Sequence, residues 1–180
     1  MADRERGTVD WYTVDPRPIL PLDSFHVPRR LARFLSKAPF RYTRDRAFES
    51  VVRACADRPD SWISEGIVRS YTRLQRLGHA HSVEVWLGEE LAGGLYGVHL
   101  GGAFFGESVF HRESNAAKAA LVHLAGHLRA RGFLLLEIQM VTPFTAPFQP
   151  RMVGKVEYGR LLRQALRVRR AWEPEQGGGS

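Results

Sequence analysis

The chain has 180 residues, of which 44% are hydrophobic and 25% charged. This length fits one globular domain with at most a small appended lobe, and the apolar fraction is too high for a disordered chain. No run approaches the roughly 18 apolar residues that a membrane-spanning helix needs. The opening segment MADRERGTVD is charged and lacks the apolar core of a secretory signal. We therefore expect a soluble, cytoplasmic protein, and we expect it to be a monomer.

Positive charge is concentrated in two segments of the chain. There are 26 basic and 19 acidic residues, which gives a net charge of +7. Residues 61–150 contain seven bases and seven acids, whereas 29–46 and 151–170 each contain seven bases and one acid. Such segments are typical of a surface that binds a polyanion. An ordinary solvated surface gives the same pattern, so both interpretations stay open at this point.

The sequence offers no pattern for a metal or a cofactor. A single cysteine, Cys55, excludes an internal disulfide and a zinc site built on cysteines. His123 and His127 have the spacing of a zinc-protease pair, but Leu124 stands where such an enzyme needs its glutamate. Nucleophile-elbow, phosphate-loop and dinucleotide-binding motifs are missing from the sequence. We predict packing or surface roles for the two histidines, and we expect no cofactor.

The first elements in chain order are helical. Prolines before residue 24 favour extended or turning backbone. Apolar periodicity then indicates helices, with Thr43 and Ser64 as the caps of the second and third and Gly78 as the end of the third. The predicted helices are 27–37, 43–56 and 64–77.

A change of pattern after these helices indicates a sheet. Residues 81–110 contain three alternating runs separated by glycine turns, which predicts an antiparallel meander. A helix follows, with Ser114 or Asn115 as its cap and Gly132 as its end. The remaining predicted elements are a strand at 133–141 and a helix at about 155–170.

The order of these elements predicts an α+β protein. A meander followed by a helix and a strand is also the order of the acetyltransferase-like (GNAT-like) fold, an analogy that by itself shows no function. We expect a small N-terminal lobe at 1–60, an acetyltransferase-like domain at 61–172 and a flexible tail at 173–180.

Three polar side chains in the predicted strands are candidate catalytic residues. Alternation places Glu107 on the face of Phe105 and Val109, so its carboxyl group is expected in an apolar pocket. A buried carboxylate must be hydrogen-bonded, ion-paired or protonated, and a structural ion pair is one open alternative. Glu137 and Gln139 are expected on one strand face, where an acid and an amide could orient an attacking amine. A solvent-facing edge is the alternative for this pair.

The junction RESNAA at 112–117 argues against an acetyl-CoA site. Acetyltransferases that use CoA carry a glycine-rich loop there, and Asn115 stands where that loop would need glycine. The amides at this helix start could still hold a phosphate or a carboxylate.

Several ordered blocks resemble the leucyl/phenylalanyl-tRNA-protein transferase family. The resemblance is dense from Ser61 to Leu121, in WISEGIVRSYTRLQRLGHAHSVEVW, GGLYGV, GESVF and RESNAAKAAL. It continues more weakly in LLLEIQ, and upstream in DWYTVDPR and FRYTRDRAFESVVRACA. It implies an aminoacyltransferase that moves Leu or Phe from aminoacyl-tRNA to the N-terminal Arg or Lys of acceptor proteins, which marks them for degradation in the N-degron pathway. It also implies a GNAT-like fold and no metal or nucleotide.

The resemblance assigns roles by position. Glu137 and Gln139 match the residues proposed in the family to orient and deprotonate the amine, and Glu107 falls in the substrate pocket. The other implied substrate-binding residues are Tyr12, Trp62, Tyr71, Leu95, Val109, Leu121, Leu124 and Ile138. The tRNA backbone is expected on the basic segments, at Arg29, Arg30, Arg33, Arg160, Arg163 and Arg167. After Gln139 the chain departs from the family pattern, and Phe144 stands about where the family has a histidine.

Two alternatives belong to other functional classes. A catalytically degenerate relative would bind tRNA or other RNA, with an affinity indifferent to aminoacylation. An acyl-CoA N-acetyltransferase is the less favoured alternative, because of the junction at 112–117.

Overall fold

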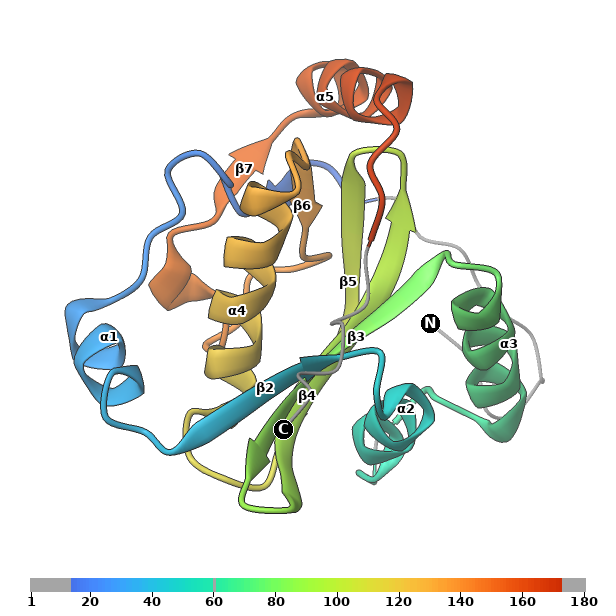
Figure 1. Ribbon diagram of the computed structural model, residues 1–180. Coiled ribbons are helices and arrows are strands. Elements are labelled where there is room, and N and C mark those ends of the chain that lie inside the picture. Colours follow the sequence, from blue (N-terminus) through green and yellow to red (C-terminus); the bar gives the residue numbers. More distant parts are fainter. Residues whose placement is uncertain (1–13, 60, 173–180) are drawn as a thin grey trace.

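A seven-stranded mixed sheet organises the fold (Figure 1). The computed structural model describes residues 14–59 and 61–172. The strands are β1 (Arg17–Ile19), β2 (Phe40–Arg44), β3 (Ala80–Leu87), β4 (Glu90–Leu100), β5 (Ala103–His111), β6 (Leu135–Glu137) and β7 (Arg151–Val153). The helices are α1 (Arg29–Leu35), α2 (Phe48–Ala56), α3 (Glu65–Arg76), α4 (Ala116–Ala130) and α5 (Lys155–Arg167), with a short 3₁₀ helix η1 (Ala146–Phe148). The predicted α+β class is confirmed.

The order of the strands follows the predicted meander. The sheet runs β2-β3-β4-β5-β6-β1-β7, and β3, β4 and β5 pair antiparallel as consecutive hairpins. The hairpin turns contain Gly88 and Gly101, whose φ values of 60° and 59° favour glycine. After β5 the chain passes through α4 and returns in β6, which pairs parallel to β5. The meander, helix and strand order of the GNAT-like fold is therefore present.

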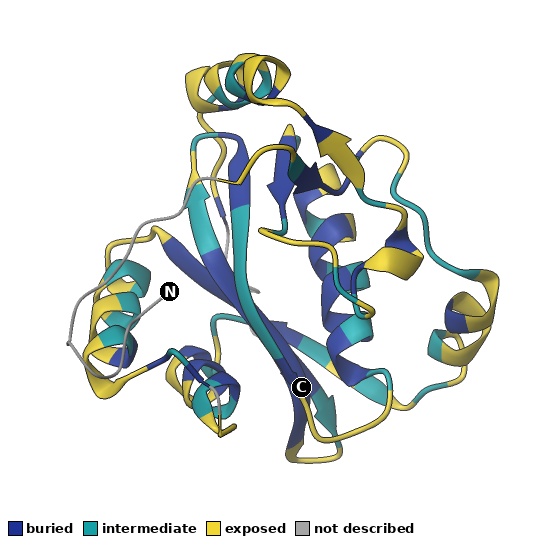
Figure 2. Ribbon diagram, turned by 180° about the vertical axis from the view of Figure 1, so that it is seen from behind, coloured by how far each residue is buried: buried dark blue, intermediate teal, exposed yellow. Residues whose placement is uncertain are grey.

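Helices cover both faces of this sheet. Neighbouring residues of β4 lie on opposite faces. Leu95 packs with Leu121, Leu124 and Leu128 in a group of buried residues that we name the α4 cluster, whereas Tyr96 packs with α2 and α3. In β6, Leu136 joins the α4 cluster, while Leu135 packs with Tyr158 and Ala165 of α5 in a second group that we name the α5 cluster. Buried residues accordingly follow the inner side of each helix and the centre of the sheet (Figure 2). The α4 helix thus covers one face, and α2, α3 and α5 cover the other.

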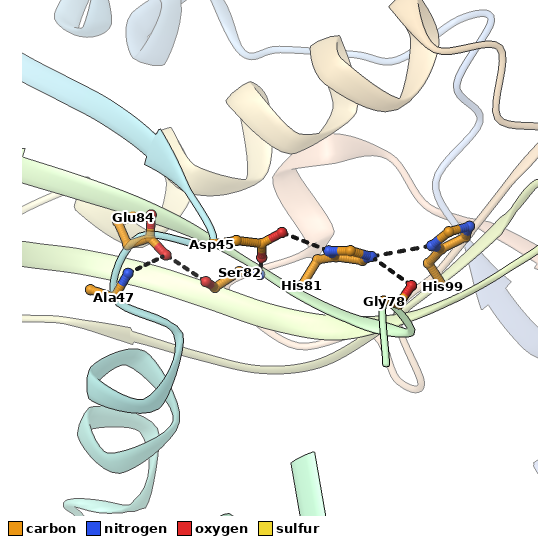
Figure 3. A network of polar contacts seen from close by, with 7 residues as sticks. All are labelled: Asp45, Ala47, Gly78, His81, Ser82, Glu84 and His99. Carbon is orange, nitrogen blue, oxygen red and sulfur yellow. Dashed lines mark hydrogen bonds and ion pairs between the residues drawn. The ribbon is translucent and has the colours of Figure 1, made fainter. Parts of the chain in front are cut away.

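The start of α2 corrects the predicted cap at Thr43. Thr43 lies in β2, and its hydroxyl donates to Glu84 Oε2 at 2.6 Å. The fully buried Glu84 also accepts from the Ser82 hydroxyl and from the Ala47 amide, so a carboxylate on β3 satisfies the helix start (Figure 3). The sequence pattern missed β2 because its residues continue without a break into the periodic stretch of the helix.

A second polar network joins the β2–α2 turn to the sheet (Figure 3). Asp45 has a left-handed φ of 56°, and its two carboxylate oxygens contact the Ser82 amide at 2.8 Å and His81 Nδ1 at 2.7 Å. His81 Nε2 lies 3.2 Å from His99 Nδ1 on β4. Trp172 stacks on His81 with ring centroids 4.4 Å apart, so the C-terminal segment also packs onto this network.

Asn115 occupies the position before α4, which is one of the two predicted cap positions, although it has a left-handed φ of 63° and makes no side-chain cap hydrogen bond. The predicted boundary of the next strand is wrong. The strand predicted at 133–141 ends at Glu137, and Gln139 has a left-handed φ of 54°. The helix α3, by contrast, begins as predicted, because the Ser64 hydroxyl accepts from the Ile67 amide.

Strands from the expected N-terminal lobe belong to the common sheet. β2 pairs with β3, and β1 lies between β6 and β7. The division at residue 60 stays a prediction, and Tyr12 and the tail at 173–180 lie outside the described residues. Among the described residues no helix is long and apolar enough to cross a membrane.

Candidate active site

A β-bulge places Glu107. Tyr96 pairs with Ser108 and Gly97 pairs with Gly106, so Glu107 is an extra residue between two ladder pairs. The bulge reverses the alternation of β5, since Phe105 packs in the α5 cluster and Val109 in the α4 cluster. The prediction that Glu107 shares a face with both residues is therefore wrong. Gly97 permits the bulge, because a Cβ at this position would collide with the Phe105 carbonyl.

The strands β5 and β6 separate beside this bulge. Their paired residues run only from Ala103 and Leu135 to Phe105 and Glu137, while β5 continues to His111. Beyond the last pair, Gln139 Nε2 donates to Glu107 Oε2 at 3.1 Å. A side-chain hydrogen bond thus spans the opening where backbone pairing has ended. We name this opening, between Glu107 on β5 and Gln139 after β6, the strand opening.

The pKa of Glu107 is raised from its ordinary value. Burial is the main cause, and the negative charge of Glu137 acts in the same direction. Hydrogen bonds from the Tyr71 hydroxyl and from Gln139 oppose this shift, because they stabilise the carboxylate. Both donors are neutral, so Glu107 has no ion-pair partner among these contacts. A carboxyl group with a raised pKa is a better proton acceptor than an ordinary carboxylate, so this environment suits acid–base chemistry.

Glu137 has a different environment. Its side chain is only 4% exposed, so the alternative of a solvent-facing edge is wrong for this residue. Arg17 Nη1 lies 2.5 Å from its Oε1, and the Tyr158 hydroxyl donates to its Oε2. The Arg17 guanidinium also lies over the Tyr158 ring, 4.8 Å from its centroid. Both oxygens of Glu137 are therefore occupied by protein donors.

Aromatic side chains cover Glu107 on the α3 side. The rings of Tyr71 and Tyr96 meet edge to face with centroids 5.1 Å apart, and Trp62 packs against the same cluster. Burial, with the nearby Glu107, raises the pKa of the Tyr71 hydroxyl. Tyr96 is fully buried, and its hydroxyl has no hydrogen-bond partner in the part of the chain that the structure describes. Polar and aromatic groups thus surround one carboxyl group.

The structure separates the remaining predicted substrate residues from this group. All of them pack in the α4 cluster, on the other face of the sheet: Leu95, Val109, Leu121, Leu124 and Ile138. Leu95, Leu121 and Leu124 are almost fully buried. Val109 and Ile138 are partly buried and come after the last paired residues of β5 and β6. The strand opening therefore lies between the polar contacts of Glu107 and the apolar residues of the α4 cluster.

The predicted tRNA-binding residues are all exposed, on two helices. Arg29, Arg30 and Arg33 lie on α1, and Arg160, Arg163 and Arg167 lie on α5. The helices α1 and α5 occupy separate corners of the molecule in both views (Figures 1 and 2). The six arginines thus form two basic surfaces rather than one.

The histidines of α4 pack against neighbouring side chains. His123 stacks on Tyr42 with ring centroids 4.8 Å apart, and its Nε2 lies 2.9 Å from Arg44 Nη1. Burial, followed by the charge of Arg44, lowers the pKa of both His123 and His127 to about 4. Neutral rings of this kind fit the predicted packing role. No group of three potential metal ligands occurs among the described residues.

Sequence reasoning missed Arg17, Tyr158 and Tyr96. A signal for Tyr158 was present, because its spacing to Leu161, Leu162 and Ala165 forms an apolar stripe along the basic helix. That stripe packs in the α5 cluster and carries the Tyr158 hydroxyl to Glu137. Arg17 and Tyr96 gave no comparable signal, since each depends on a contact between distant strands.

An antiparallel meander, a crossover helix and a parallel strand that separates from the meander give this protein the acetyltransferase-like fold. Comparison with known proteins gives the family. The family model described as leucyl/phenylalanyl-tRNA protein transferase matches residues 19–163. The chain belongs to this family, and it is an aminoacyltransferase.

Curated relatives carry the same description. A leucyl/phenylalanyl-tRNA–protein transferase of Salinibacter ruber is 51% identical over 97% of this chain and 77% of the relative. Those of Gloeobacter violaceus and Akkermansia muciniphila are 48% and 50% identical, each over 92% of this chain, and over 86% and 88% of the relatives. Among solved structures, an aminoglycoside acetyltransferase from a soil metagenomic sample overlaps 72% of this chain and 88% of its own, at 12% identity and a TM-score of 0.46.

Proposed function

We propose that this chain joins Leu or Phe from aminoacyl-tRNA to the N-terminal Arg or Lys of an acceptor protein at the strand opening. The observation that carries this assignment is the hydrogen bond between Gln139 and Glu107 across the two separating strands. It holds an amide and a carboxyl group with a raised pKa side by side, at the edge of an apolar cluster. An incoming amine can replace this hydrogen bond with contacts of its own.

The reaction needs a positioned amine and a path for one proton. The lone pair of the acceptor α-amine attacks the ester carbonyl carbon, and a carbon–nitrogen bond forms as the carbon–oxygen bond to the ribose breaks. The amine loses one proton, and the ribose oxygen gains one, so the balance needs no co-reactant. An α-amine with a pKa of about 7.7 to 8.0 is partly neutral at physiological pH. Alignment of two bound reactants can then supply much of the rate enhancement.

Glu107 and Gln139 divide this work. The Gln139 side-chain oxygen accepts a hydrogen bond from the acceptor amine and orients it, while the Glu107 carboxylate takes the proton and passes it to the ribose oxygen. Glu137 acts as a positioning residue rather than as the base. Its two oxygens are engaged by Arg17 and Tyr158, and its charge helps to raise the pKa of Glu107.

The predicted substrate residues fall on two sides of the strand opening. The aminoacyl side chain is assigned to the apolar side, entered past Val109 and Ile138 and backed by the α4 cluster. The terminal adenosine is assigned to the aromatic side, at Trp62 and Tyr71, with Tyr12 as a further contact. The tRNA backbone is assigned to the basic surfaces of α1 and α5, and the protein is assigned as a monomer that acts in the cytoplasm.

A transfer assay tests the function. Radiolabelled Leu-tRNA and Phe-tRNA are incubated with the full chain and a protein that begins with Arg, and label in the acceptor protein is measured. We expect transfer, and we expect Glu107→Gln to lower kcat/KM by about 10² to 10⁴. The exposed Glu113→Gln is the matched control and should keep the rate of the unmodified chain.

The same assay separates the alternatives. If the unmodified chain transfers no label yet binds charged and uncharged tRNA equally, it is a tRNA-binding relative without catalysis. If Glu107→Gln transfers as fast as the Glu113→Gln control at every pH, the proposed role of Glu107 is wrong. Protonation of the acceptor amine lowers kcat/KM on acidification in every variant. An additional fall that the Glu113→Gln control shows and Glu107→Gln lacks would support the role.

A further inference from the structure

A surface cavity lies between α1 and the first turns of α4, which neighbour each other in the fold (Figure 1). Its volume is about 410 Å³, which is within the range of small-molecule sites. Arg30 and Phe34 of α1 line it on one side, and Asn115 and Lys118 line it on the other. The cavity therefore lies between the basic surface of α1 and α4, the helix that contributes residues to the predicted apolar pocket.

Charge favours an anionic occupant. Arg30 and Lys118 are cations that come from separate elements, and none of the seven lining residues is acidic. Neither α1 nor α4 has an acidic residue in its first turn, and Glu113 is the acidic residue nearest in sequence to the lining residue Asn115. Arg29 and Arg33 stand beside Arg30 on the same short helix. Two cations that converge on one cavity are suited to a single phosphate group.

The rest of the lining favours a flat apolar group next to that phosphate. Pro28 and Pro147 contribute rigid apolar surface, and the Phe34 ring is 39% exposed. Exposed aromatic rings beside cations are the usual platform on which nucleic-acid bases stack. A nucleotide supplies both chemistries at once, a phosphate for the cations and a base for the ring.

The position along α4 relates this cavity to the strand opening. Lys118 precedes Leu121 by three residues of the helix, about 4.5 Å of axial rise. Leu121 and Val109 belong to the same cluster, and Val109 follows the bulge that carries Glu107. A ligand whose end group lies at the strand opening could therefore place the preceding part of its chain near Lys118.

We propose that this cavity binds a phosphodiester-linked nucleotide of the tRNA acceptor end, on the 5′ side of the terminal adenosine. The proposal rests on the proposed function, because it supposes that the terminal adenosine is bound at the strand opening. Arg30 and Lys118 hold the phosphate, the Asn115 side chain offers a hydrogen bond to the sugar or base, and the base lies against Phe34.

Donors of different length test this site in the full chain. The donors are phenylalanyl-adenosine without a 5′ phosphate, a phenylalanyl-CCA trinucleotide, and Phe-tRNA. The variants are Arg30→Gln with Lys118→Met, and separately Phe34→Ala. The control is Arg129→Gln, which removes an exposed cation from the other end of α4. Thermal unfolding checks that every variant folds.

We expect the double variant to raise KM for the trinucleotide about tenfold, as the loss of charge-assisted hydrogen bonds to one phosphate predicts. KM for phenylalanyl-adenosine should change less than about twofold, since that donor lacks the phosphate. Phe34→Ala should also raise KM for the trinucleotide more than KM for phenylalanyl-adenosine, but by a smaller factor. Arg129→Gln should leave both KM values unchanged.

Two results would overturn the proposal. Equal KM changes for both donors would mean that the cations act on the terminal adenosine or on the fold, and unchanged KM values for both would mean that the cavity binds no nucleotide. Failure of the proposed function is a separate result, since the unmodified chain would then use none of the three donors.

Discussion

Replacing Tyr158 by Phe removes one oxygen atom from the network that holds Glu137. The phenyl ring keeps its place in the α5 cluster and beneath the Arg17 guanidinium, so packing is retained. What is lost is a hydrogen bond to a carboxylate that is 4% exposed. Hydrogen bonds to charged groups contribute about 1.5 to 3 kcal/mol. Because the Arg17 side chain is 29% exposed and still contacts the carboxylate, we expect a loss of about 2 kcal/mol in the free energy of unfolding.

Tyr96→Phe is the same chemical change with the opposite expectation. The Tyr96 hydroxyl is fully buried and has no hydrogen-bond partner among the described residues. Burial without a partner destabilises the folded state, so the removal of this oxygen should stabilise the protein by up to about 1 kcal/mol or leave it unchanged. The two variants therefore compare the stability contribution of a hydroxyl that donates a hydrogen bond with that of a buried hydroxyl without a partner.

Urea unfolding of both variants measures the difference. Equal slopes of the free energy against urea concentration would show that the compactness of the two states is unchanged. The reasoning is refuted if Tyr158→Phe costs less than about 0.5 kcal/mol, the scatter of neutral substitutions, or if both variants lose the same stability. Glu137 would then not be anchored by Tyr158.

Two further predictions concern charge. The pKa values of His123 and His127 are lowered to about 4, so the neutral rings stabilise the fold above the unfolded pKa of about 6.5, and this contribution is lost as the pH falls towards 4. Within this window, each ring that takes up a proton only on unfolding adds a slope of up to about 1.4 kcal/mol per pH unit, and solvent screening narrows the window. Urea unfolding at pH 7, 5.5 and 4.5 should therefore give a smaller slope for His123→Phe. Replacing Arg163 and Arg167 by Gln should weaken tRNA binding and reduce its dependence on salt, and an unchanged salt slope would remove α5 from the tRNA surface.

The larger elements of the fold could be predicted because local signals agree there. In α3, a serine cap, an apolar stripe and a terminal glycine all point to the same helix, which begins at Glu65 as expected. The short strands β1, β2 and β7 could not be predicted, because each is only three to five residues long and depends on distant partners. The predicted cap of α2 was wrong for the same reason, because the group that accepts from the Ala47 amide is Glu84, which lies far away in sequence on β3.

The candidate site was predictable in composition but not in arrangement. Glu107, Glu137 and Gln139 were identified from the residues, yet alternation put Phe105 and Val109 on one face with Glu107, and the structure puts these two neighbours on opposite faces. One inserted residue in the β4–β5 ladder reverses the direction of every side chain after it, and no sequence period records that insertion. The early end of β6 likewise turns Gln139 out of the extended backbone and towards Glu107.

Environment, rather than residue type, distinguishes the two acids of the site. Glu137 receives a guanidinium and a phenol hydroxyl, which together stabilise its negative charge in a buried position. Glu107 receives only neutral donors and lies near that charge, so its own ionisation becomes less favourable. Two neighbouring carboxyl groups in different environments can thus take different roles, one held by protein donors and one with a raised pKa. The bulge at Glu107 is therefore the backbone feature on which the proposed proton transfer depends.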